Sequence, residues 1–149
     1  MLTVYGEGRG FRVVWLLEEL GLVYRLRPVD LFAVEHDRDF LAINPAGFIP
    51  VLQDGETIMV ESVAILQYLL ARHDSASLAV APDEPAFASY LQFLHLGEAG
   101  LAGPMNGVIV GRNLAPEAER DVRVTRWALE TFESRLGLVT RRLADCPYL

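Results

Sequence analysis

The chain has 149 residues, of which 52% are hydrophobic and 22% charged, which fits one domain or two small ones and excludes global disorder. Its formal net charge of −7 argues against a nucleic-acid partner, because such binding neutralises phosphates. The single cysteine, Cys146, excludes an internal disulfide. The sequence shows neither a run long enough to span a membrane nor a secretory signal. We therefore expect a cytoplasmic protein without a membrane partner.

The first 72 residues alternate between strand and helix patterns. Residues 2–5 form a β-prone run, and glycines 6, 8 and 10 indicate a turn after it. Residues 11–20 then predict an apolar helix. The next elements are a strand over 23–29 and a short helix around Phe40. The pattern then predicts a hairpin of two strands, over 49–53 and 57–60, and a helix over 61–72. This βαβ–ββα order predicts a four-stranded mixed sheet with helices on its faces.

The composition changes between residues 73 and 85 to Asp, Ser, Ala and Pro. We therefore expect a first domain over 1–74, a linker over 75–85 and a helical domain over 86–149. Glycines and Pro104 predict a kink or break after a helix over 87–96, and a second helix begins near Pro116. Its apolar stripe needs more partners than one broken helix, which predicts that this all-α domain is incomplete. The stripe comprises Leu129, Phe132, Leu136, Val139 and Leu143.

Three motifs, in order, carry a family resemblance. They are Trp15-Leu16-Leu17-Glu18-Glu19-Leu20-Gly21, Asn44-Pro45-Ala46-Gly47-Phe48-Ile49-Pro50-Val51-Leu52, and Glu61-Ser62-Val63-Ala64-Ile65-Leu66-Gln67-Tyr68-Leu69. The chain closely resembles the glutathione transferase superfamily. The resemblance implies an α/β thioredoxin-like domain that binds glutathione, followed by an all-α domain that helps to bind an electrophilic small molecule. It also implies a cytosolic homodimer, formed around helices 61–72 and 87–96.

The candidate binding residues follow from these motifs. Pro50 opens a strand, where a cis bond to Ile49 is the natural candidate, although trans is the commoner isomer at such bonds. The resemblance implies that Ile49 pairs with the cysteinyl backbone of glutathione. Ser62 and Glu61 stand at a helix start, where they either cap the helix or bind the carboxylate and ammonium of the ligand. Phe48 occupies a position where family members often hold the glycyl carboxylate with Lys or Gln.

More than one residue could activate the thiol of the ligand. The resemblance implies that the activating residue is either a Tyr at the end of the first strand, here Tyr5, or a Ser or Cys at position 10. Position 10 is a glycine in this sequence, and Gly10 has no side chain. Tyr5 is equally well explained as a core residue. Arg9 and Arg12 oppose the helix dipole, and either could stabilise a thiolate or hold a carboxylate. The catalytic candidates are therefore Tyr5, Arg9 and Arg12.

The sequence leaves three functions open. The first is a transferase with glutathione as co-substrate. The second is a non-catalytic binding or interaction module on the same scaffold, favoured by Gly10 and Phe48. The third is a glutathione-dependent isomerase or dehalogenase. The three histidines show no ligand spacing, so we expect no metal.

Overall fold

A computed structural model describes residues 1–73 and 78–149. The chain forms two compact units, Met1–Ala79 and Val80–Leu149. Residues 75–77 of the predicted linker lie outside the described residues. Within the described ranges, none of the helices combines the length and apolar character that a membrane span requires.

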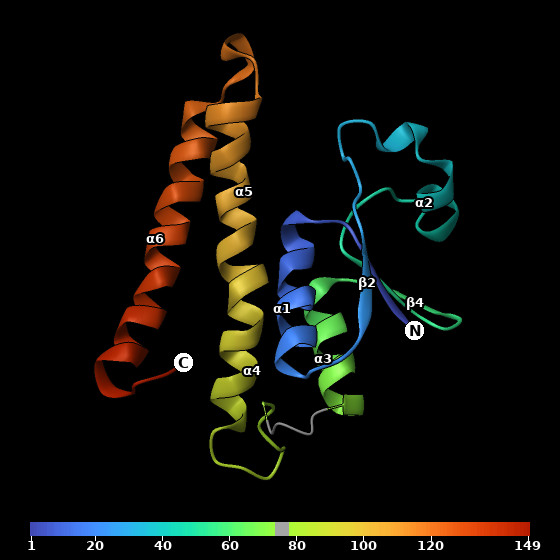
Figure 1. Cartoon of the computed structure of the whole chain (residues 1–149). Helices are drawn as coiled ribbons and strands as arrows, with labels where there is room; N and C mark the ends of the chain where they lie inside the picture. Colours follow the sequence, from blue (N-terminus) through green and yellow to red (C-terminus); the bar gives the residue numbers. More distant parts are fainter. Residues whose placement is uncertain (74–77) are drawn as a thin grey trace. The chain divides into compact units, whose positions relative to one another are not determined.

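The first unit is built on a four-stranded sheet (Figure 1). Its strands are β1 (Leu2–Tyr5), β2 (Tyr24–Arg27), β3 (Val51–Asp54) and β4 (Thr57–Val60), in the spatial order β2-β1-β3-β4. β1 runs parallel to β2 and antiparallel to β3, and β3 forms a hairpin with β4. The predicted mixed sheet and its βαβ–ββα order are confirmed.

The alternation of side chains along β1 distributes the core over both faces of the sheet. Val4 packs with residues of α1 (Phe11–Glu19) and α3 (Ser62–His73) on one face. Tyr5 packs with Phe40 of α2 (Arg38–Ile43) on the other. Helices therefore cover both faces, and the unit has the expected thioredoxin-like fold (Figure 1).

Of the kink or break predicted in the first helix of the second unit, the structure excludes the break. α4 (Phe87–His95) continues through the π-helical segment η3 (Leu96–Ala102), α5 (Gly103–Ile109) and a second π-helical segment, η4 (Val110–Leu114). A proline interrupts a helix because it lacks an N–H and crowds the preceding turn. Pro104 lies in the first turn of α5, directly after the wider η3, so the helix accommodates it instead of ending.

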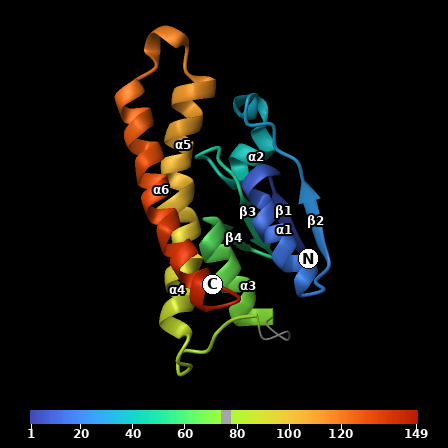
Figure 2. The same cartoon turned by 90° about the vertical axis from the view of Figure 1, so that its left-hand side faces the viewer.

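The last helix, α6 (Val122–Asp145), runs beside α5 (Figure 2). It begins six residues later than the sequence predicted, because Pro116 is followed only by a 3-10 turn over Glu117–Glu119. The true N-cap is Asp121, whose carboxylate accepts from the N–H groups of Arg123 and Val124. Of the predicted stripe, Leu129, Phe132 and Val139 are half-buried, whereas Leu136 and Leu143 are exposed.

Candidate functional site

The loop before β3 offers unpaired backbone at Ile49. The Ile49–Pro50 peptide bond is cis, the isomer favoured in the sequence analysis. Among the described residues, neither the N–H nor the C=O of Ile49 has a hydrogen-bond partner. These two groups can pair with an extended peptide in the manner of an added strand.

Gly6 makes the close approach to this loop possible. Its N–H donates to the C=O of Arg27 across 2.8 Å, and its φ of +92° lies in the region that favours glycine. A Cβ at this position would overlap the side chain of Ile49. The end of β1 can therefore meet Ile49 only if residue 6 lacks a side chain.

Asn44 holds the other side of the loop, a role that the sequence analysis did not assign. Its buried amide donates from Nδ2 to the C=O of Phe48 across 2.8 Å. Its Oδ1 accepts from the N–H of Ala46, and its C=O accepts from the N–H of Gly47. The turn pattern at residues 44–47 was the available signal. The phenyl group of Phe48 is 39% exposed and offers no polar atom to a ligand.

Glu61 and Ser62 form the start of α3. Glu61 is exposed and has a φ of +68°, a conformation that costs free energy in a residue with a side chain. Its C=O accepts from the N–H of Ile65 across 2.9 Å, which makes Glu61 the N-cap. The first N–H groups of α3 have no partner within the helix, and they favour an anion.

Arg12 reaches the same place from α1. Its Nη1 donates to Oγ of Ser62 across 3.1 Å, although the two residues are 50 positions apart in the sequence. Ser62 is only 4% exposed. The structure thus brings together a guanidinium, a hydroxyl and a helix N-terminus, which is the chemistry that binds a carboxylate.

Tyr5 does not join this group. Its hydroxyl donates to Oε1 of Gln53 across 2.7 Å, and its ring is 9% exposed and packs against Phe40. Because Tyr5 and Val4 alternate along β1, the ring lies on the face of the sheet opposite α1 and α3. The side chain of Arg9, the third catalytic candidate, lies outside the described residues.

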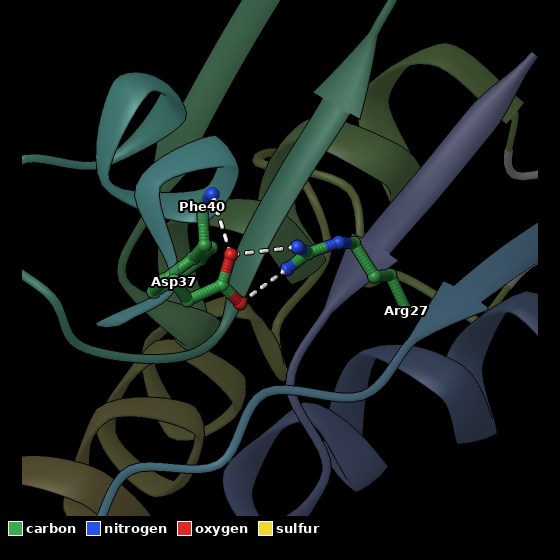
Figure 3. A network of polar contacts seen from close by, with 3 residues as sticks. All are labelled: Arg27, Asp37 and Phe40. Carbon is green, nitrogen blue, oxygen red and sulfur yellow. Dashed lines mark hydrogen bonds and ion pairs between the residues drawn. The ribbon is translucent and has the colours of Figure 1, made fainter. Parts of the chain in front are cut away.

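An ion pair on the α2 side of the sheet fixes the start of α2 (Figure 3). Arg27 donates through both terminal nitrogens to the carboxylate of Asp37, at 2.9 and 2.8 Å. Asp37 also accepts from the N–H of Phe40. The bonds from Arg27, and then from Phe40, hold the pKa of Asp37 below its ordinary value, and the same pair raises the pKa of Arg27. The guanidinium lies 5.6 Å from the centre of the Tyr5 ring.

A cavity of about 410 Å³ opens beside Ile49. Glu7 and Gly8, residues 28–32 and Ile49 line it. Most of these side chains are apolar, and the charged ones are Glu7 and Asp30. Such a space suits an apolar small molecule next to a ligand bound on Ile49. Within the described residues, no group of three or more His, Cys, Asp or Glu could hold a metal ion.

A thioredoxin-like domain with unpaired backbone groups before β3 and a guanidinium and hydroxyl at the start of α3 suits an extended peptide that carries a carboxylate. The family model that matches residues 10–77 is described as the glutathione S-transferase N-terminal domain. Glutathione S-transferase GstB of Escherichia coli is 31% identical over 155 aligned residues, covering 99% of this chain and 74% of that protein. The chain therefore belongs to the glutathione transferase superfamily.

Other similar proteins and solved structures also carry glutathione transferase names. Glutathione S-transferase 4 of Zea mays is 33% identical over 141 residues, which cover 93% of this chain and 63% of that protein. Among solved structures, the theta class enzyme of Xanthomonas axonopodis pv. citri with glutathione bound is 30% identical, with a TM-score of 0.78, over 99% of this chain and 72% of that one. Glutathione transferase URE2P6 of Phanerochaete chrysosporium, in complex with oxidized glutathione, is 28% identical with a TM-score of 0.83. The match covers 97% of this chain and 68% of that one.

Proposed function

We propose that this protein is a glutathione transferase that activates the glutathione thiol for attack on an electrophilic small molecule. The hydrogen bond from Arg12 to Ser62 at the start of α3 carries the proposal. This contact places the guanidinium of Arg12 beside the hydroxyl of Ser62 and the first N–H groups of α3. Positive charge and hydrogen-bond donors therefore meet at the start of α3, although the chain has a net charge of −7. A peptide with a carboxylate at one end is the ligand that such a place favours.

In this proposal, glutathione lies extended along the loop before β3. Its cysteinyl backbone pairs with the N–H and C=O of Ile49, next to Pro50. Its γ-glutamyl carboxylate meets Arg12, Ser62 and the first N–H groups of α3, and Glu61 accepts from its ammonium group. Phe48 contacts the glycyl end through apolar surface alone.

The thiol then lies between β1 and α1. A free thiol is mostly protonated at neutral pH, and a nearby cation lowers its pKa. Since Arg12 is engaged with Ser62 and the hydroxyl of Tyr5 with Gln53, we assign this role to Arg9. The thiol proton passes to water, the thiolate sulfur forms a bond to an electrophilic carbon, and the leaving group departs with its electron pair.

Binding and turnover are tested separately. Retention on immobilised glutathione tests binding, and conjugation of 1-chloro-2,4-dinitrobenzene tests turnover. Loss of a charge-assisted hydrogen bond costs about 1.5–3 kcal/mol, so we expect Arg12→Ala and Ser62→Ala to raise the KM for glutathione by about tenfold or more. Arg9→Ala should lower kcat by about 10²-fold. Arg25→Ala, which removes an exposed arginine of β2, is the matched control and should change neither.

Two observations favour a second candidate, a glutathione-binding module without turnover. Gly10 has no side chain, and the hydroxyl of Tyr5 is committed to Gln53. Retention on immobilised glutathione together with no conjugation of any electrophile would support the module. An isomerase or dehalogenase uses the same activated thiol, and formation of the product without net consumption of glutathione would identify the isomerase.

We also propose that the protein acts in the cytoplasm as a homodimer, as the resemblance to the family implies. In this arrangement α3 and α4 contribute to the subunit interface. Sedimentation at micromolar concentration tests the dimer, and a compact monomer would contradict it.

A further inference from the structure

The register of the sheet determines where the two ends of a peptide bound at Ile49 must lie. β3 begins shortly after Ile49, and its first residue, Val51, pairs with Val60, the last residue of β4. Because Glu61 follows Val60, the start of α3 lies on the β3 side of Ile49, and Phe48 lies on the other side. An extended peptide that pairs with Ile49 and has one end at α3 therefore has its opposite end at Phe48.

These two ends differ in charge. The start of α3 receives the guanidinium of Arg12, which comes from α1. Residues 41–71, which contain the loop, the hairpin and most of α3, include no Arg, Lys or His. The basic side chains that precede this stretch most closely, His36 and Arg38, are exposed, and the imidazole of His36 lies 3.6 Å from the carboxylate of the residue before it. The stretch itself therefore offers no positive charge to an anion at Phe48.

The loop around Phe48 presents an apolar side chain, and most of its polar backbone groups are already bonded. Nδ2 of Asn44 donates to the C=O of Phe48 across 2.8 Å, and the N–H groups of Ala46 and Gly47 both donate to Asn44. A Cβ at Gly47 would meet the side chain of Leu41, at 3.6 Å. The ring of Phe48, a residue that is 39% exposed, is therefore the side chain that a ligand meets at this end.

From this asymmetry we propose that the preferred thiol ligand is a γ-glutamylcysteinyl peptide whose C-terminal end is uncharged and apolar, and that Phe48 selects it. The inference rests on the proposed function, because it names the ligand class of the same site. A carboxylate placed against the ring of Phe48 loses water without gaining a partner, which costs free energy. An apolar group at the same place buries its surface against the ring, which is favourable.

Isothermal titration of the full chain with glutathione and with its glycyl monoethyl ester tests the proposal. The ester keeps the γ-glutamyl carboxylate, the ammonium group and the thiol. It should bind at least about threefold more tightly than glutathione, close to the ratio that one buried CH2 group supplies. Phe48→Ala should remove this preference. Phe48→Lys offers the glycyl carboxylate a partner and should reverse the preference, with about tenfold tighter binding of glutathione than in the wild type. Val23→Lys adds the same charge at an exposed apolar position before β2 and, as the matched control, should still prefer the ester.

Three outcomes would overturn this inference and leave the proposed function intact. Equal or tighter binding of glutathione by the wild type would show that another group, such as His36 or Arg38, binds the glycyl carboxylate. A preference for the ester that survives in Phe48→Ala would exclude selection by the ring. A reversal in Val23→Lys as well as in Phe48→Lys would show that net charge alone decides. Binding of neither compound would contradict the proposed function itself. Circular dichroism verifies that the variants are folded, and Phe48→Gln replaces Phe48→Lys if the lysine variant is not.

Discussion

The hydroxyl of Tyr5 donates its proton to Oε1 of Gln53, 2.7 Å away on the neighbouring strand. A phenolic hydroxyl has one proton to donate, so this bond competes with any bond from Tyr5 to a thiolate. The aromatic ring is covered by Phe40 on one side and approached by the guanidinium of Arg27. Tyr5 therefore has the surroundings of a core residue that carries one satisfied polar atom.

Replacement of Tyr5 by Phe keeps the ring and removes this bond. We expect the free energy of unfolding to fall by about 1 kcal/mol and kcat for conjugation to stay unchanged. Urea unfolding and steady-state kinetics measure the two effects. Tyr24→Phe, which removes a hydroxyl bound to the exposed Glu18, is the control and should be nearly silent in both. A fall in kcat of about 10²-fold would instead assign Tyr5 as the donor to the thiolate.

Most of the first unit is predictable from the sequence because its signals are local. Alternating apolar residues, the glycine turn and the hairpin signal at Asp54-Gly55 each specify their element without distant contacts, although Asp54 itself ends β3 and the turn begins at Gly55. The two roles of Tyr5 could not be separated in the same way. The choice depends on Gln53, 48 positions away, and a pattern of residue types does not report which hydroxyl reaches which amide.

The glycine at position 6 gives a second prediction, on stability. Gly6→Ala places a methyl group at a φ of +92° and against the side chain of Ile49. Gly21→Ala meets a similar φ of +64°, but its Cβ has open space. In both variants the left-handed conformation of the new alanine lowers the free energy of unfolding by about 1–2 kcal/mol. Gly6→Ala should cost about 1–3 kcal/mol more for overpacking.

Urea unfolding of the two glycine variants gives the comparison directly. Equal destabilisation would mean that the loop at Ile49 moves aside without cost, and that Gly6 serves only the conformation of the turn. With the loop displaced, the KM for glutathione should rise in Gly6→Ala and stay unchanged in Gly21→Ala.

The ion pair of Arg27 with Asp37 gives a prediction on pH dependence. The pKa of Asp37 is lower in the folded protein than in the unfolded chain, so its contribution to stability is present above pH about 4, the unfolded value. That contribution is lost as the pH falls through the lower, folded pKa. Asp37→Asn should therefore destabilise the protein at pH 7 and lose less stability than the wild type between pH 5 and pH 2.

Chemical denaturation at a series of pH values measures this effect. Asp39→Asn removes an exposed carboxylate from the same helix and should leave the acid limb of the wild type unchanged. Parallel acid limbs in the wild type and Asp37→Asn would contradict the assigned role of the pair. No local pattern predicts this pair, because Arg27 ends β2 and Asp37 is the N-cap of α2, and only the fold brings these two positions together.

The second unit was predicted less well, for a physical reason. Glycine and proline disfavour a helix through local terms of about 1 and 3 kcal/mol, and these residues therefore predicted a kink or a break. Packing overrides these terms where the glycines allow close approach: a Cβ at Gly107 would lie 3.3 Å from Cβ of Ala128 on α6. The helix continues because α5 packs against α6. The segments on either side of α5, η3 and η4, are π-helical instead of α-helical.

Arg135 of α6 carries the last prediction, because it supports one of these turns. Its Nη1 donates to the C=O of Gly100 across 3.0 Å and reaches the C=O of Ala99 at 3.4 Å, both within η3. Arg135→Met keeps the aliphatic stem and removes both hydrogen bonds, which should cost about 0.5–1.5 kcal/mol. The amide protons of residues 96–102 should then exchange faster with solvent, because opening of η3 needs less free energy. Arg141→Met, on the exposed surface of the same helix, is the control. Unchanged exchange in Arg135→Met would show that η3 is stabilised by its packing alone.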